Sequence, residues 1–124
     1  ASVRSLAALP EDTLVLPSHG PPFRGASARV LELERHHEQR CLDLLENLGE
    51  PRSAGELLSV LFRRELDPVQ LILAMSEAIA HLEYLAERGD VERLPGEDGV
   101  TRYVRRPAVG EAGPTCLRAS SPLR

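Results

Sequence analysis

Apolar residues recur at spacings of three and four along much of the chain, which is the spacing of amphipathic helices. The first such stretch starts near Ser27, and Gly49 is placed to cap its C-terminal end. Its apolar positions are Val30, Leu33, His37, Cys41, Leu44, Leu45 and Leu48. This pattern predicts a long helix over about residues 27–48.

Capping residues mark the start of a second helix. Ser53 and Glu56 have the spacing of a capping box, in which each side chain accepts a hydrogen bond from the other residue's backbone N–H. A dense apolar group follows, formed by Leu57, Leu58, Val60, Leu61 and Phe62. We therefore expect a second helix to begin at Ser53.

A third helix is predicted from Asp67 to about Arg88. Asp67 suits the N-cap, Pro68 the first turn, and Gln70 can reach back to the cap. Gly89 suits the end of the helix. The apolar set of this helix is so wide that the pattern predicts burial on more than one side.

Short β-prone runs lie on both sides of these helices. Val91–Leu94 and Val100–Val104 flank a five-residue loop, which predicts a hairpin. Near the N-terminus, residues 2–9 could form two helical turns, and Thr13–Leu16 reads as a short buried strand. Three helices followed by a two-stranded wing predict a mainly α, winged-helix-like domain with a small β-hairpin.

Composition and charge limit the classes of function that this chain can have. The 124 residues, 42% hydrophobic and 27% charged, suit a soluble globular protein. A net charge of -4, an acidic third helix and an acidic wing loop argue against specific DNA binding, because phosphate contacts supply most of that affinity. No apolar stretch approaches the length of a membrane span, and the two cysteines form no CxxC motif, so we expect a cytoplasmic protein.

The candidate chemistry is concentrated at His19. It follows the apolar run within "LPSHGPP", where prolines and a glycine make a stiff loop, and such loops often carry metal ligands. His37 and Cys41 would share a helix face, but zinc needs three or four ligands, so a half-buried histidine and a buried thiol are the favoured interpretation. His36 should face solvent, and His81 should be a hydrogen-bonded core histidine.

Four stretches together carry a family resemblance: "DTLVLPSHGPPF", "LELERHHEQR", "AHLEYLAERGDVER" and "TRYV". They resemble the C-terminal part of metallo-β-lactamase-fold hydrolases, in particular the β-lactamase-like group with a winged-helix extension. In that family a Pro-Gly-His-Gly-Pro loop ends the last strand of the αββα sandwich and its histidine ligates zinc. His19 matches that ligand, although Ser18 stands where the family usually has glycine.

The resemblance implies a division of the chain. Residues 1–25 would end the catalytic domain, 26–106 would form the winged-helix domain, and 107–124 would be a proline-containing tail. The family's His-x-His-x-Asp-His motif is absent, so we expect a C-terminal fragment that is inactive alone. The full-length parent would be a metal-dependent hydrolase with two zinc ions.

The resemblance also implies partners. This part would pack on its own upstream catalytic domain and form one wall of a cleft for a small ester, thioester, lactam or RNA substrate. We expect no specific binding to DNA and no association with a membrane, and the sequence does not decide whether the protein forms a homodimer. The alternative is a winged-helix DNA-binding or protein-interaction module, complete as it stands.

Overall fold

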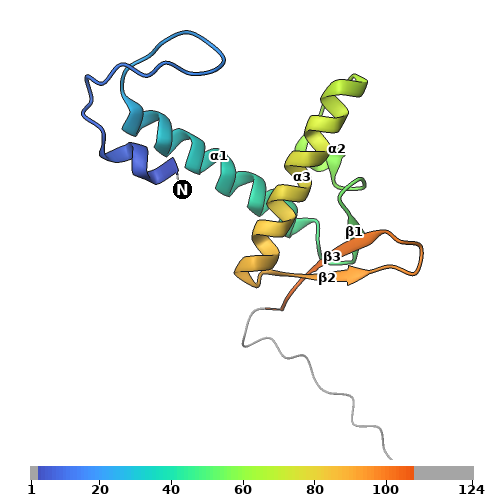
Figure 1. Ribbon diagram of the computed structural model, residues 1–124. Helices are drawn as coiled ribbons and strands as arrows, with labels where there is room; N and C mark the ends of the chain where they lie inside the picture. The colour runs from blue at the N-terminus through green and yellow to red at the C-terminus, as the bar shows by residue number, and fades with distance from the viewer. Residues whose placement is uncertain (1–2, 108–124) are drawn as a thin grey trace, which may run out of the picture.

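The computed structural model describes residues 3–107 and is mainly helical with one small antiparallel sheet, as predicted (Figure 1). In chain order its elements are the 3-10 helix η1 (Val3–Ala8), α1 (Ala26–Glu46), β1 (Arg52–Ser53), α2 (Leu58–Leu61), α3 (Pro68–Arg88), β2 (Val91–Pro95) and β3 (Thr101–Arg105). The predicted tail 107–124 lies outside the described residues apart from Pro107.

Both ends of α3 are set by the residues that the sequence indicates. The Asp67 side chain accepts from the backbone N–H of Gln70 at 2.9 Å, and the Gln70 side chain accepts from the backbone of Asp67. Gly89 ends the helix with φ 84°, a left-handed conformation that glycine adopts without a steric penalty. The predicted third helix is therefore confirmed.

The other two helices end or begin elsewhere than predicted. Helix α1 ends at Glu46, with Asn47 rather than Gly49 as its C-cap, because the Asn47 side chain donates to the carbonyl of Asp43. Ser53 and Glu56 do make their reciprocal bonds, but the bonds close a turn ahead of the four-residue α2. The Ser53 backbone belongs to β1, so the second helix cannot begin there.

The sheet has the order β1-β3-β2, with both pairs antiparallel. The predicted hairpin is confirmed, and within it Arg93 pairs with Tyr103. Its loop is closed by a 3.0 Å bond from the Gly96 N–H to the Val100 carbonyl. Strand β1 was not predicted, because two residues are too few to show an alternating pattern.

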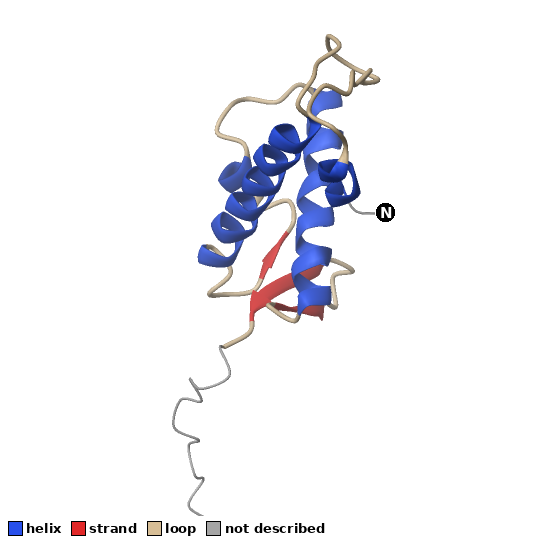
Figure 2. Cartoon of the chain, turned by 90° about the vertical axis from the view of Figure 1, so that its left-hand side faces the viewer, coloured by secondary structure: helices blue, strands red, loops and turns tan. Residues whose placement is uncertain are grey.

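The core lies where the two long helices meet the sheet, which sits at one end of both helices in Figure 2. Its buried members are Cys41, Leu44, Leu48, Ala54, Leu57, Leu82, Leu85, Val91 and Tyr103. Every element from α1 to β3 except α2 and β1 contributes a buried residue to this cluster, and residues 54–57 contribute from the turn before α2. Helices α1 and α3 and the sheet therefore share one hydrophobic core.

Two burial predictions are wrong. The stretch Thr13–Leu16 is not a buried strand: only Val15 pairs, with Phe23, and Leu16 is 73% exposed. Among residues 3–107 no further strand lies beside it to cover its side chains. The wide apolar set of α3 is also not buried on more than one side: its buried residues share one face, and Val69, Ile72 and Leu73 are each about two thirds exposed.

Helix α3 also corrects the expectation about membrane spans. It is long and apolar enough to cross a bilayer by length and composition alone. Core helices of soluble proteins meet the same criterion, and α3 buries Ala74, Ala78, His81, Leu82 and Leu85 in the packed unit. The helix is thus weak evidence for a membrane protein.

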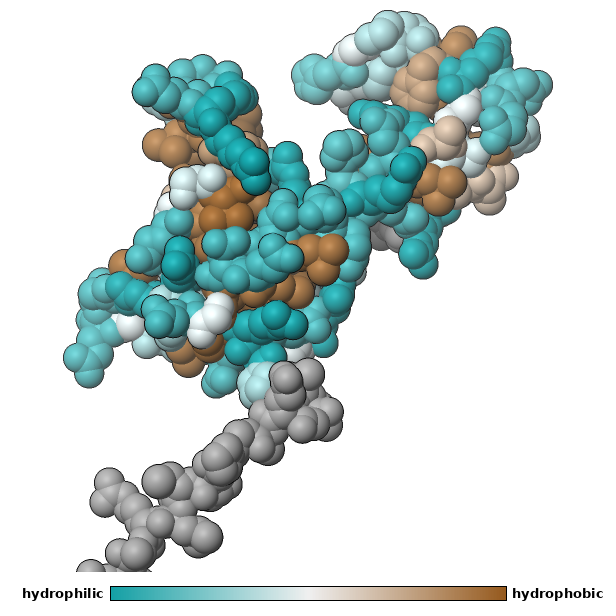
Figure 3. Space-filling model, turned by 180° about the vertical axis from the view of Figure 1, so that it is seen from behind, coloured by the Kyte–Doolittle hydropathy of each residue, from teal (hydrophilic) through white to brown (hydrophobic). Residues whose placement is uncertain are grey.

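Exposed apolar residues occur on α1, beside the wing and on two projecting parts of the molecule. In Figure 3 apolar patches interrupt the polar surface of the part formed by the N-terminal segment and of the part formed by α2 and the start of α3. The exposed leucines of the first part include Leu14 and Leu16. The exposed apolar residues of the second part include Val69, Ile72 and Leu73, which share one helix face on the first half of α3.

Candidate functional site

His19 lies at the exposed tip of a short loop. The loop is closed at its base by two backbone bonds between Val15 and Phe23, of 2.8 and 3.1 Å. Gly20, directly after the histidine, has φ 94° and permits the sharp turn there. The imidazole is therefore presented outward on a loop whose two ends are held together.

The loop brings no second metal ligand to His19. Within residues 3–107 no group of three His, Cys, Asp or Glu side chains could hold a metal ion. Zinc sites use three or four protein ligands, or three and a water. One histidine of this chain does not by itself fit a zinc ion, and its assignment as a ligand stays a prediction.

His37 and His81 come together where α1 crosses α3. His37 Nδ1 lies 3.0 Å from His81 Nε2, and the ring centroids are 4.6 Å apart. The Tyr84 ring, from the next turn of α3, makes a T-shaped contact with the His37 ring, with centroids 4.8 Å apart. His81 is buried, as predicted for a hydrogen-bonded core histidine, while His36 is exposed as predicted.

The carbonyl of Glu77 determines the tautomers of both rings. His81 Nδ1 lies 2.8 Å from this oxygen, which can only accept, so Nδ1 carries a hydrogen. In the neutral ring His81 Nε2 is then an acceptor, and His37 Nδ1 must donate to it. His37 Nε2 is left as an acceptor facing the Cys41 sulfur at 3.9 Å. The hydrogen bonds therefore all point the same way: the Cys41 thiol donates weakly to His37, His37 donates to His81, and His81 donates to the Glu77 carbonyl.

These three side chains do not form a metal site in this arrangement. The two nitrogens of His37 face opposite partners, His81 and Cys41, so the three groups do not converge on one point. Burial lowers the pKa of both histidines and raises the pKa of the Cys41 thiol. The thiol therefore stays protonated at neutral pH and is not an activated nucleophile.

An open hollow of about 540 Å³ lies above the histidine pair, between α1 and α3. Its lining residues are Arg29, Glu32, Leu33, His36, His37, Arg40, Glu77 and His81. The Arg40 guanidinium pairs with Glu77 across the two helices and also lies over the Phe62 ring, 5.3 Å from its centroid. Arg29 pairs with Glu32, so the two arginines are each matched by a carboxylate.

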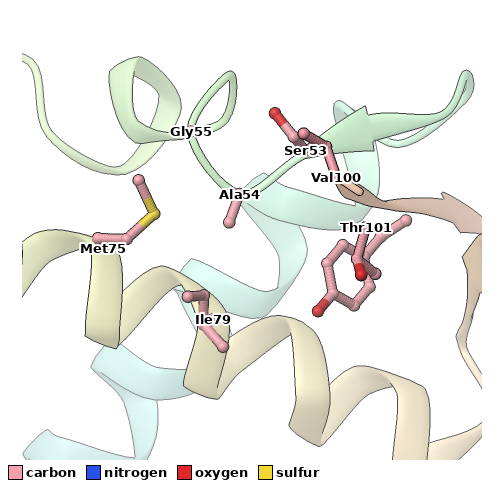
Figure 4. Close-up of a pocket in the computed structure, with 8 residues that line it drawn as sticks. Ser53, Ala54, Gly55, Met75, Ile79, Val100 and Thr101 are labelled. Carbon is pink, nitrogen blue, oxygen red and sulfur yellow. The ribbon is translucent and has the colours of Figure 1, made fainter. Parts of the chain in front are cut away.

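A second hollow, of about 450 Å³, opens between α3, the turn before α2 and the start of β3 (Figure 4). Its lining residues are Ser53, Ala54, Gly55, Met75, Ile79, Val100, Thr101 and Tyr103. The Tyr103 hydroxyl donates to Glu83 at 2.6 Å, and burial together with this bond raises the pKa of Tyr103 to about 12. No acid or base in the lining is poised to act near neutral pH.

Two arginines of the wing hairpin are engaged in ion pairs. Arg102 pairs with Asp98 at 2.8 Å, and Arg93 pairs with Glu83 on α3. The exposed face at the start of α3 is apolar rather than basic. These ion pairs leave the guanidinium groups of Arg93 and Arg102 less available to phosphate.

The sequence analysis predicted that His37 and His81 are at least partly buried, but it did not predict that the two side chains contact each other. The spacing of apolar residues places each histidine at an inward-facing position of its own helix, so the sequence contains a signal for the burial of each one. Their contact depends on where α1 crosses α3, and 44 residues separate them along the chain. The crossing point is a result of core packing, which the pattern of one helix does not contain.

Comparisons with known proteins identify the family. Residues 41–106 match the family model described as "Metallo-beta-lactamase-like, C-terminal domain". The crystal structure of a β-lactamase domain protein from Burkholderia ambifaria is 42% identical, with a TM-score of 0.79. A metallo-β-lactamase family protein from Thermus thermophilus is 36% identical, with a TM-score of 0.67.

Both alignments cover 84% of this chain and 31% of the longer one, so the chain spans about a third of the length of these solved structures. No curated protein matches the chain. The family model alone covers more than half of the 124 residues, including the core cluster and the whole sheet. The chain belongs to the metallo-β-lactamase-like C-terminal domain family.

Proposed function

We propose that this chain is the C-terminal part of a zinc-dependent hydrolase of the metallo-β-lactamase superfamily, and that His19 is one of the metal ligands of the whole enzyme. The observation that carries the proposal is the family match of residues 41–106 together with an exposed histidine on a closed loop just before that domain. A neutral imidazole binds zinc without adding negative charge, which keeps the metal electrophilic. When bound, zinc would supply an acidic water and polarise the scissile group.

We further propose that residues 26–106 form a winged-helix domain. Three helices precede a hairpin, and β1 adds a third strand to it, which is the element order of that fold. Two arginines of the hairpin, Arg93 and Arg102, are engaged in ion pairs, which disfavours the use of this surface for DNA. Specific DNA binding is thus the weaker alternative.

The role of the domain in the enzyme would be to pack on the upstream catalytic domain and to form one wall of its substrate cleft. Two exposed apolar groups support this role: Leu14 and Leu16 beside the His19 loop, and Val69, Ile72 and Leu73 on α3. Side chains exposed to this degree gain free energy when another domain covers them, at roughly 25 cal/mol per Å² of apolar surface. Substrates in keeping with the superfamily are an ester, a thioester, a lactam or an RNA phosphodiester. The buried free thiol of Cys41 suits a reducing cytoplasm.

A substrate panel on the full-length protein tests the proposal. Hydrolysis of a thioester, a lactone, a β-lactam and an RNA oligomer is measured before and after chelation, and again after zinc is restored. We expect at least one substrate to be hydrolysed, with activity that is lost on chelation and recovered with zinc. Activity that persists in the apoprotein, or a full-length sequence without the His-x-His-x-Asp-His motif, would contradict the proposal.

A further inference from the structure

We propose that His37 and His81 form a proton-sensitive contact that holds α1 against α3 and opens when the pair takes up a second proton. The contact lies apart from the His19 loop and has no part in the function proposed above. It links two helices that are far apart in the chain, through atoms 3.0 Å apart. Protonation of the pair can therefore change how α1 packs against α3.

The hydrogen-bond directions determine how many protons the pair can hold. With both rings neutral, His37 Nδ1 donates to His81 Nε2, and His81 Nδ1 donates to the Glu77 carbonyl. One added proton can be accommodated, because one charged ring can still face one neutral acceptor. With two added protons, both facing nitrogens carry hydrogens and neither can accept. The 3.0 Å contact then becomes a repulsion between two donors and two positive charges.

The charged and titratable groups around the pair come from both helices. On α1 they are Glu38, Arg40 and Cys41, and on α3 they are Glu77, Tyr84 and Arg88. Arg29, Glu32 and His36 line the hollow above. Arg40 opposes a charge on His81, and Arg88 opposes a charge on His37, while only Glu38 favours one on His37. The carboxylate of Glu77 is already engaged by Arg40.

The sign of the pH effect follows from these surroundings. Burial is the main cause that lowers the pKa of each histidine, so the unfolded chain binds protons more readily than the folded one. The stability that the neutral pair contributes is complete above the ordinary histidine pKa of about 6.5. It is lost as the pH falls through the lowered values in the folded protein. The α1–α3 contact should therefore weaken on acidification below the ordinary histidine pKa and not above it.

Side-chain nitrogen NMR on the 124-residue chain reads the hydrogen positions directly. We expect both rings at about pH 7.5 to carry the hydrogen on Nδ1, and at least one of them to take up its second ring proton at a lower pH than an ordinary histidine, whose pKa is about 6.5. Two independent titrations near pH 6.5 for His37 and His81, or an Nε2–H tautomer for His81 at about pH 7.5, would overturn the proposal.

A pair of variants then links the contact to folding. His37→Gln removes one titrating ring but keeps an N–H that can donate to His81, and His36→Gln removes an exposed histidine from the same helix. Melting temperatures are measured at about pH 7.5 and about pH 5.5, on either side of the ordinary histidine pKa. We expect the wild type and His36→Gln to lose at least ~5 °C on acidification, and His37→Gln to lose less than half as much. An equal loss in all three proteins would contradict the proposal. If His37→Gln does not fold, the NMR titration of the wild type decides.

Discussion

The hydrogen bond from Tyr103 to Glu83 offers a sharp test of how the sheet is fastened to α3. Tyr103 is 4% exposed in the middle of β3, and its hydroxyl donates to Glu83 Oε1 at 2.6 Å. The same oxygen accepts from Arg93 Nε on β2 at 3.1 Å. One carboxylate on α3 therefore holds two neighbouring strands. The substitution Tyr103→Phe removes the hydroxyl and leaves the ring in place.

The expected cost follows from the nature of the acceptor. Hydrogen bonds to charged groups contribute roughly 1.5–3 kcal/mol. Glu83 keeps Arg93 after the substitution, and its side chain is 37% exposed, so water can replace part of what is lost. We therefore expect Tyr103→Phe to lower the free energy of unfolding by about 1–2 kcal/mol, or roughly 4–16 °C in melting temperature for a domain of this size.

Urea unfolding followed by circular dichroism measures this cost, with Tyr84→Phe as the control. Tyr84 is 40% exposed on the same helix; the change keeps its ring contacts with His37 and Arg88 and removes only a solvent-accessible hydroxyl that hydrogen-bonds the Arg88 side chain. The control should cost less than ~0.5 kcal/mol. The bond also lowers the pKa of Glu83, so its contribution is present at neutral pH and lost as the pH falls through that lowered value. Equal midpoints for Tyr103→Phe and wild type at neutral pH would refute the reasoning.

Three further substitutions test the fold itself, each by urea unfolding at neutral pH. Leu82→Ala, at a fully buried position, should lower the free energy of unfolding by about 2.7–5 kcal/mol. Leu73→Ala, on the exposed face of the same helix, should lower it far less. Similar values for the two variants would contradict the assignment of Leu82 to the core. Asp67→Ala removes the α3 N-cap and should cost ~1 kcal/mol, and no change would show that the cap is redundant. Gly96→Ala should cost about 1–3 kcal/mol, because its new Cβ would lie 2.6 Å from a backbone oxygen of the wing loop. Gly49→Ala, where no atom lies within 4 Å, is its control and should be nearly neutral.

Local signals in the sequence were enough to predict much of this fold. The capping box at Asp67 and the glycine after Arg88 define α3, because both act through backbone groups within one turn. The hairpin is equally local, since its loop length and β-prone flanks are adjacent in the chain. The same kind of signal gave a wrong prediction at Ser53, because this first residue of the capping box belongs to β1, whose partner strand β3 lies far along the chain.

Features that depend on distant partners could not be predicted. The strand expected at Thr13–Leu16 reduces to one bridge, because β structure needs a neighbouring strand and, among residues 3–107, this stretch pairs only through Val15 with Phe23. The contact of His37 with His81 likewise depends on the crossing of two helices. For His19 the sequence predicts a loop position, and the structure agrees, but a ligand's role depends on groups that the described part of this chain does not bring to it.

The central claim, that His19 is a metal ligand of a larger hydrolase, is tested most directly by the metal content of the full-length protein. Zinc per polypeptide is measured by mass spectrometry for the wild type, for His19→Ala and for His36→Ala as an exposed control, with thermal melts of the 124-residue chain carrying the same substitutions. We expect His19→Ala alone to lose most of the zinc from one site and to lower the hydrolytic rate, while the melting temperature of the chain is unchanged, because His19 is exposed on a loop outside the core. Zinc content and rate equal to the wild type in His19→Ala would contradict the claim.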